Sequence, residues 1–365
     1  MSNTINGFKF IDGSAEGFTF DSITYFDKRT LYFIRTDADG EKGFLYINGK
    51  KYGQTKTSIE SAADYTTFEA LEDTTFTFTK NLYGADMQYS LDNGNTWTLL
   101  PSGTATPTIH EGEKVMWKGT YTTENNSEAT PGIGTFTSTG KCNLSGNALS
   151  LVYGDDFENH DTLPNVDGIL ACLFSNLEAN EQCKIVDAYN FKLTSPTVPA
   201  YGYSYMFYRN GNMVVAPDVK AETVGDYGCL DMFAICSNLV IAPKLTAVNL
   251  GVNAYNEMFA YCTRMIASPE LPATNLGVGC YITMFADCSA LVSAPKLNAT
   301  TLSEACYSLM FSGCTSLTTA PKLPATTLTD GCYSGMFHGC KNLVTPPSLS
   351  ASVLAEYCYS GMFVN

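Results

Sequence analysis

The chain has 365 residues, of which 45% are hydrophobic and 12% aromatic, so we expect a folded protein of two or three domains. Its 36 acidic and 21 basic residues give a formal net charge of −15. We therefore expect no binding to nucleic acid or to anionic membrane surfaces, because both would repel the chain. The sequence offers no run of about 18 apolar residues for a membrane span. Its first residues lack the basic and apolar regions of a secretory signal.

Residues 1–54 are predicted to form a β-hairpin module. Leu31–Arg35 and Phe44–Ile47 are apolar runs that we expect to pair through a turn at Asp39-Gly40, and Asn48-Gly49 marks the next tight turn. Residues 55–67 are largely polar and are interpreted as a linker.

Residues 68–163 are predicted to form a β-sandwich-like domain. Thr75–Thr79 alternates strictly between polar and aromatic residues, as a half-buried strand does, and Val115–Gly119 and Gly134–Ser138 continue the series. Ser90–Trp97 matches the Asp-box of sialidase propellers. Because a propeller would carry several copies and this chain has one, we interpret the motif as a hairpin turn with Trp97 packed beneath it.

Two acidic clusters are candidate calcium sites. The first contains Asp37, Asp39 and Glu41, but Asn48 occupies the position where a calcium loop needs a bidentate glutamate. The second spans Asp155 to Asp161. Solvated turns are favoured for both, and the sequence calls for no cofactor and no metal.

Residues 164–365 carry a strict 26-residue repeat. Three features recur at this interval, and we call each set of equivalent residues a column. They are a Met-Phe pair, an apolar residue and a proline. The methionines of the pairs are Met206, Met232, Met258, Met284, Met310, Met336 and Met362. The apolar residues are Met213, Leu239, Met265, Leu291, Leu317 and Leu343, and the prolines are Pro217, Pro243, Pro269, Pro295, Pro321 and Pro347.

Each repeat is predicted to be a short strand, a turn and a helical segment. Leu328, Cys332, Met336 and Cys340 follow one another at intervals of four, which favours one apolar stripe on a helix. A single unit cannot bury that stripe, but stacked units bury it jointly. The predicted fold class is therefore mainly β N-terminal modules followed by an α/β repeat solenoid.

The pattern Met-Phe-x-Gly-Cys-x-x-Leu-x-x-x-Pro-x-Leu-Pro-Ala-x-x-Leu resembles the Bacteroides surface-antigen (BspA-like) branch of the leucine-rich repeats. The resemblance covers about residues 200–365, with a degenerate first turn near Leu173-Phe174. It departs at Asn210, which replaces the usual cysteine, and at Gly228-Cys229, which replaces Cys-Tyr. The β-rich region before the repeats is also similar to the one that often precedes them in such surface proteins.

The repeat places cysteines in two columns, four residues before and four residues after each methionine of the Met-Phe pair. The first column accepts Gly, Ala and Cys, so it requires a small buried residue. Cysteines within one repeat are eight residues apart, too far for a disulfide, and no Cys-x-x-Cys motif supports zinc. We expect free structural thiols.

A tyrosine recurs three residues before the methionine, for example at Tyr281, Tyr307 and Tyr333. Burial of the ring with a hydrated hydroxyl is the favoured interpretation. An aromatic stripe that stacks sugars is the alternative.

The strand of each repeat offers a candidate binding face. Side chains alternate between the two faces of a strand. We therefore expect Leu317, Thr319, Pro321 and Leu323 to point inside, and the residues between them to form an exposed concave face. The exposed face has an apolar column (Val214, Val240, Ile266, Val292, Thr318, Val344) and a mostly charged column (Asp218, Lys244, Glu270, Lys296, Lys322, Ser348). Such a face is typical of a contact surface. Alternation of charge between neighbouring strands, which stabilises a sheet, is the other explanation.

The sequence shows no nucleophile–base pair, metal triad or phosphate loop, so we do not expect an enzyme. Tyr32 to Gly53 resembles N-terminal hairpins of phage structural proteins. That resemblance implies a virion fibre, decoration or receptor-binding component of a phage of Bacteroides-like hosts. Its N-terminal module would bind other virion proteins, its solenoid a host surface protein or glycan, and homo-oligomers are an option. The alternatives are a bacterial cell-surface adhesin whose export signal is absent from this sequence and a carbohydrate-binding module.

Overall fold

The structure is a computed structural model, and the residues it describes fall into two units, 1–62 and 63–365. In the first unit it describes the backbone of five strands. In the second it describes residues 64–81, 84, 86–121, 132–177 and 181–364. No helix among these residues is both long enough and apolar enough to cross a lipid bilayer.

The first unit contains one sheet of order β1-β2-β3-β4-β5. Its strands are β1 (Asn3–Ile5), β2 (Phe8–Asp12), β3 (Leu31–Arg35), β4 (Gly43–Ile47) and β5 (Lys50–Tyr52). The predicted hairpins are confirmed, since β3 pairs antiparallel with β4 and β4 pairs antiparallel with β5. The turn at Asp39-Gly40 and the acidic cluster around it lie outside the described residues.

The second unit opens with two packed β-sheets. The larger sheet has the order β15-β12-β6-β10-β8-β9 and the smaller has β11-β7. Their strands are β6 (Thr66–Ala70), β7 (Phe76–Lys80), β8 (Asp86–Ser90), β9 (Thr98–Leu100), β10 (Lys114–Thr120), β11 (Gly134–Ser138), β12 (Lys141–Asn147) and β15 (Lys184–Lys192). The three strands predicted for this region are confirmed as β7, β10 and β11. β6 begins at Thr66, inside the predicted linker.

Aromatic rings from both sheets form the core between them. Phe68 of β6 stacks on Phe76 of β7 with ring centroids 4.7 Å apart, and Trp117 of β10 meets Phe136 of β11 edge-on at 5.0 Å. All four side chains are buried. Alternation along each strand places such rings on one face, so two sheets joined face to face remove them from water together.

Helical structure is confined to two short elements among the described residues. These are α1 (Ser150–Tyr153) and the 3-10 helix η2 (Gly154–Asn159). Two further short strands, β13 (Ser175–Asn176) and β14 (Glu181–Gln182), pair with each other. The fold is therefore mainly β.

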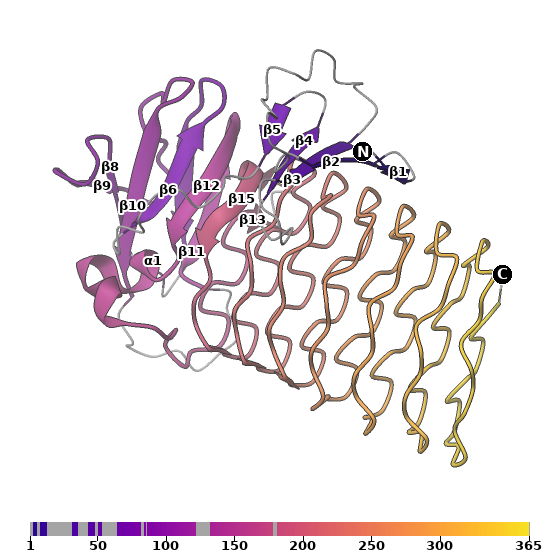
Figure 1. Cartoon of the computed structure of the whole chain (residues 1–365). Coiled ribbons are helices and arrows are strands. Elements are labelled where there is room, and N and C mark those ends of the chain that lie inside the picture. Colours follow the sequence, from indigo (N-terminus) through magenta and orange to yellow (C-terminus); the bar gives the residue numbers. More distant parts are fainter. Residues whose placement is uncertain are drawn as a thin grey trace. The chain divides into compact units, whose positions relative to one another are not determined.

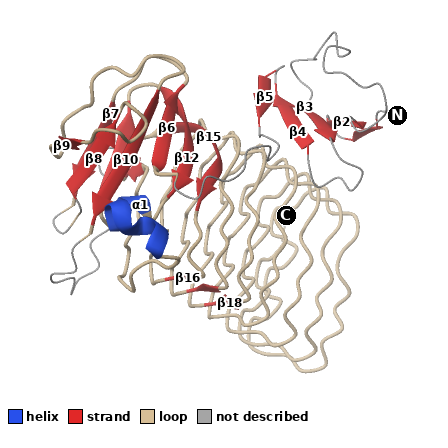
Figure 2. Ribbon diagram, turned by 60° about the vertical axis from the view of Figure 1, so that its left-hand side comes forward, coloured by secondary structure: helices blue, strands red, loops and turns tan. Residues whose placement is uncertain are grey.

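From residue 164 onward the chain forms successive coils that lie side by side (Figure 1). Equivalent positions 26 residues apart form parallel bridges, such as Val215 with Ile241 and Leu271 with Leu297. A second line of pairing comprises β16 (Thr197–Val198), β17 (Thr223–Val224) and β18 (Asn249–Leu250), near the lower edge of the coils in Figure 2. From residue 251 to 364 only isolated bridges continue these lines.

The helical segment predicted for each repeat is wrong, because the chain forms a run of tight turns there. Between Gly279 and Cys288, every second N–H donates to the carbonyl three residues back, as Ile282 does to Gly279 at 3.0 Å. The N–H groups in between donate to the next coil, as Tyr281 does to Cys306 at 3.0 Å. Gly279, Thr283 and Asp287 have positive φ values of 62°, 50° and 57°, so the backbone reverses its hand every four residues. An α-helix allows neither feature.

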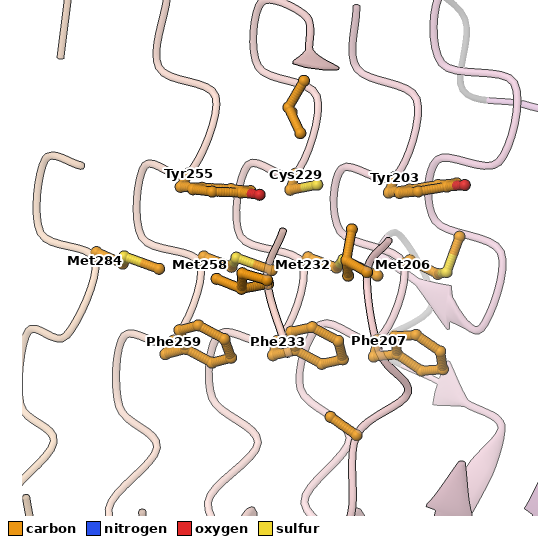
Figure 3. Packing of buried hydrophobic residues seen from close by; sticks show 14 of the residues in the cluster. Tyr203, Met206, Phe207, Cys229, Met232, Phe233, Tyr255, Met258, Phe259 and Met284 are labelled. Carbon is orange, nitrogen blue, oxygen red and sulfur yellow. The ribbon is translucent and has the colours of Figure 1, made fainter. Parts of the chain in front are cut away.

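The side chains of these turns form straight columns through the stack (Figure 3). Phe207, Phe233 and Phe259 stack nearly parallel with centroids 5.3 and 5.6 Å apart. A methionine column runs beside them, and its seven members are at most 3% exposed. Cys229 occupies the place of the tyrosine in its coil, between Tyr203 and Tyr255.

The coils continue directly from the sandwich. Phe174 stacks on Phe207 at 5.1 Å and also contacts Phe136 of the sandwich core at 6.1 Å, so the ring stack of the coils reaches back to the predicted position near Leu173-Phe174. β15 pairs with β12 on one side, and its Asp187 bridges to Val215 of the next coil on the other. One hydrophobic core therefore runs through the sandwich and the stack, across the domain boundary predicted between residues 163 and 164.

Replacing Met310 by alanine should lower the free energy of unfolding by about 2–5 kcal/mol, because it empties a fully buried site between neighbouring coils. Chemical denaturation followed by circular dichroism would measure the change. Thr319→Ala, at an exposed position of the same coil, is the control and should cost less than about 0.5 kcal/mol. Equal stability of Met310→Ala and the unmodified chain would contradict the packing described here.

Candidate functional site

The predicted binding face lies along the first line of bridges between coils. Each coil contributes a short segment that runs through the proline column, and bridges form on both sides of the proline at positions four residues apart, such as Val215 and Val219. The carbonyl of Val214 accepts the N–H of Val240 at 3.0 Å, and the carbonyl of Ile266 accepts that of Val292 at 3.0 Å. This pairing sets equivalent side chains of successive coils in rows. We call the two rows predicted to be exposed the strand-face columns.

The apolar strand-face column is only partly exposed. Val214, Ile266 and Val292 are half-buried, Thr318 is exposed, and Val344 is 80% exposed. Val240 is 6% exposed, so its predicted place on an open face is wrong.

Strict alternation fails on the other parity as well, since Thr319, predicted inside, is exposed. The reason is that the coils after β15 make only isolated bridges along this line. The segments between bridges are therefore free to leave the two-residue period.

The charged strand-face column is accessible along the stack. Lys244, Glu270, Lys296 and Lys322 are exposed, and Asp218 is half-buried with its Oδ1 accepting the backbone N–H of Lys244 at 2.9 Å. Among the described residues no ion pair joins two members of this column. Any mutual support of neighbouring charges therefore does not take the form of direct ion pairs.

The tyrosine stripe cannot stack sugars, and that alternative is wrong for the predicted residues. Tyr281, Tyr307 and Tyr333 are at most 1% exposed and stack on one another with centroids 5.5 and 5.7 Å apart. Burial raises the pKa of Tyr281 well above its ordinary value. The rings are packing elements between the coils, as predicted, but the hydrated hydroxyl predicted for them is wrong for Tyr281 and Tyr333, whose hydroxyl oxygens are buried without a hydrogen-bond partner among the described residues.

The thiols also lie inside the stack, where they do more than fill space. All thirteen cysteines are free and buried. The Sγ of Cys236 donates to the carbonyl of Phe207 one coil earlier at 3.1 Å, and Cys262, Cys288, Cys314 and Cys340 repeat the bond at 3.0–3.2 Å. Asn210, which departs from the repeat pattern, does the same with its amide and donates to the carbonyl of Cys183 at 3.1 Å. This column therefore selects a small side chain that can donate a hydrogen bond.

The Asp-box turn has the predicted form. Asp92 accepts the N–H of Thr96 at 2.9 Å and its hydroxyl at 2.7 Å, and these bonds lower the pKa of Asp92 to about 2. Trp97 packs on Tyr65 at 4.8 Å. The motif is a structural hairpin between β8 and β9.

The junction cluster directs its carboxylates to separate partners. Asp155 binds Lys118 and Tyr65, whereas Asp156 binds Asn159 and His160. No group of three or more metal-ligating side chains is assembled among the described residues.

Sequence reasoning missed one buried carboxyl group on the turn face. Asp231 is 9% exposed, and burial together with the charge of Glu257 on the next coil raises its pKa from 3.8 to about 7. A hydrogen bond with Tyr205 partly offsets this rise. Asp231 and Glu257 are one 26-residue repeat apart, so the repeat register marks them as neighbours, but only the stacked coils show that Asp231 is buried.

The thiols should resist modification in the folded protein. Burial raises the pKa of Cys262 and Cys288, and the thiolate is the reactive form. We expect no reaction with an aromatic disulfide reagent in the native state and thirteen reactive thiols after unfolding in guanidinium. Rapid reaction of any thiol in native buffer would contradict the buried ladder.

Asp231→Asn should stabilise the protein above pH 7. A carboxyl group with a raised pKa binds more protons in the folded than in the unfolded state between about pH 4 and pH 7, so stability falls as the pH rises through that window. A pKa difference of one is worth about 1.4 kcal/mol, so the variant should gain on the order of a few kcal/mol at pH 8 and almost nothing at pH 4.

Thermal melts of this variant between pH 4 and pH 8 would measure the gain. Asp287→Asn, the same change at an exposed position of the next coil but one, serves as the control. A gain for Asp231→Asn that does not depend on pH would contradict the raised pKa.

Comparison with known proteins adds no relative. Neither a protein-family model, nor a curated protein, nor a solved structure matches this chain. Its function has therefore to be inferred from its own residues and their arrangement.

Proposed function

We propose that this chain is a recognition protein whose residues 164–365 form a leucine-rich repeat solenoid of the BspA-like type. The single observation that carries the proposal is the distribution of side chains in the stacked coils. The repeated Tyr, Met, Phe and Cys residues are almost all inside, whereas the charged side chains of Lys244, Glu270, Lys296 and Lys322 are outside. A scaffold of this kind keeps a fixed frame and presents its outer columns to a partner.

The strand-face columns are the proposed contact surface. Half-buried apolar side chains such as Ile266 and Val292 lie beside the exposed charges of Lys244, Glu270 and Lys296. Contact surfaces combine apolar area that excludes water with polar groups that fix orientation. Because three of the four exposed charges, those of Lys244, Lys296 and Lys322, are positive, the surface suits a host protein or glycan with negative groups.

We further propose that the protein belongs to a phage virion, as a fibre, decoration or receptor-binding component. The support is the resemblance of Tyr32 to Gly53 to N-terminal hairpins of phage structural proteins, together with the sheet formed by β3, β4 and β5. In this proposal the N-terminal unit attaches to other virion proteins and the solenoid meets the host.

The attachment step is tested on purified particles. Gold-labelled antibody to this chain should decorate intact phage particles in electron micrographs. If the antibody instead labels uninfected bacterial cells and leaves particles bare, the chain is a cell-surface adhesin and the virion proposal is wrong.

The recognition step is tested with the full chain and intact host cells. The double variant Lys296→Glu, Lys322→Glu should bind cells at least about tenfold more weakly, because it reverses two adjacent charges of the surface. Lys141→Glu, an exposed lysine of β12 outside the coils, is the matched control and should bind normally. Equal binding of all three proteins would remove the strand-face columns from the proposal.

A further inference from the structure

A polar pocket lies on the outer face of the larger sheet, away from the strand-face columns. Leu99 of β9, Gln88 of β8 and Lys118 of β10 are direct cross-strand neighbours. Two residues further along β10 and β8, Thr120 pairs with Asp86. These five side chains therefore share one face of three adjacent strands. They form the floor of a cavity of about 450 Å³.

The pocket is walled by residues from elsewhere in the sandwich. Lys80, at the end of β7, reaches Asp86 with its Nζ at 2.8 Å. Gly154 and Asp155, at the start of η2, also line the pocket. A Cβ at Gly154 would lie 2.9 Å from the hydroxyl of Thr120, and its φ of 57° suits glycine, so the missing side chain keeps this wall open.

Lys118 is the most enclosed charged group of the pocket. Its side chain is 11% exposed, its ammonium donates to both oxygens of Asp155 at 2.7 Å, and it lies 4.3 Å from the ring centroid of Trp97. Asp155 in turn accepts the hydroxyl of Tyr65 at 2.7 Å. This network fixes the ammonium and carboxylate before any ligand arrives.

The charges of the lining cancel, which decides the class of ligand. Lys80 is paired with Asp86 and Lys118 with Asp155, so neither an anion nor a cation is favoured as a whole. The lining still offers N–H donors, carboxylate acceptors, an amide and a hydroxyl, which serve both roles. Leu99, 56% exposed, adds one apolar surface to the lining.

We propose that this pocket binds a neutral sugar of one or two rings. Hydroxyl groups donate and accept at once, as the mixed lining requires, and the apolar face of a pyranose ring fits against Leu99. The volume lies in the lower part of the range of about 300–1,000 Å³ found for ligand pockets. The inference is independent of the buried tyrosine stripe and of the strand-face columns.

The test is titration of the full chain with glucose, galactose, N-acetylglucosamine, lactose and maltose, followed by tryptophan fluorescence and calorimetry. Trp97 lies against Lys118, so it reports on events at the pocket. At least one sugar should bind. Gln88→Leu, which keeps the size of the side chain and removes its amide, should weaken that binding at least about tenfold, the effect of losing one or two hydrogen bonds.

Three comparisons make the test specific. Asn190→Leu, an exposed amide on β15 of the same sheet, and the double variant Lys296→Glu, Lys322→Glu should both bind the sugar normally. Thermal melts should show that Gln88→Leu is folded. The proposal is overturned if no sugar of the panel binds, if Gln88→Leu binds as well as the unmodified chain, or if inorganic phosphate competes for the pocket.

Discussion

The rest of the structure depends on the stacking of equivalent aromatic rings from coil to coil. Phe136 of the sandwich meets Phe174, and from there the phenylalanine ladder continues through every coil to Phe363, with centroid separations of 5.1–5.8 Å. The ladder runs beside the backbone hydrogen bonds between coils, and both interactions join each coil to the next. Because each ring is buried only when its neighbours are present, the coils are stable jointly and the sandwich serves as the first layer.

The backbone of the coils adapts to this stacking at a local energetic cost. Non-glycine residues such as Glu257, Tyr261 and Leu309 have positive φ values of 54°, 61° and 55°. L-residues adopt that region only where other interactions compensate for it. Here the compensation comes from the alternating hydrogen bonds, half within a coil and half between coils, and from the thiols and the Asn210 amide that donate to carbonyls of the preceding coil.

This construction separates the reactive side chains from the surface. The cysteine thiols and the hydroxyls of the buried tyrosine stripe, which in other settings carry chemistry, are enclosed and held in their neutral forms by burial. What faces solvent on the coils is a set of short columns with mixed charge, suited to contact with a macromolecule. The polar pocket belongs to the sandwich, where strand pairing and not the repeat places Gln88 beside Lys118. The two proposed binding sites therefore lie on different parts of the fold, and a test of one site does not decide the other.

The sequence by itself determined the 26-residue period, the buried columns, the free thiols and the strands of the sandwich, because each of these follows from local alternation or from strict repetition. It also determined that Lys244, Lys296 and Lys322 face water. The helix was mispredicted because an interval of four residues fits two structures. On an α-helix of 3.6 residues per turn each such step drifts by about 40°, whereas in a run of four-residue turns it does not drift at all, and Leu328, Cys332, Met336 and Cys340 keep the interval without correction. Only contacts between coils decide between the two. Tertiary structure alone also buried Val240, exposed Thr319, raised the pKa of Asp231 and assembled the pocket, since each depends on which segments lie side by side, and pairing between distant segments leaves no local pattern in the chain.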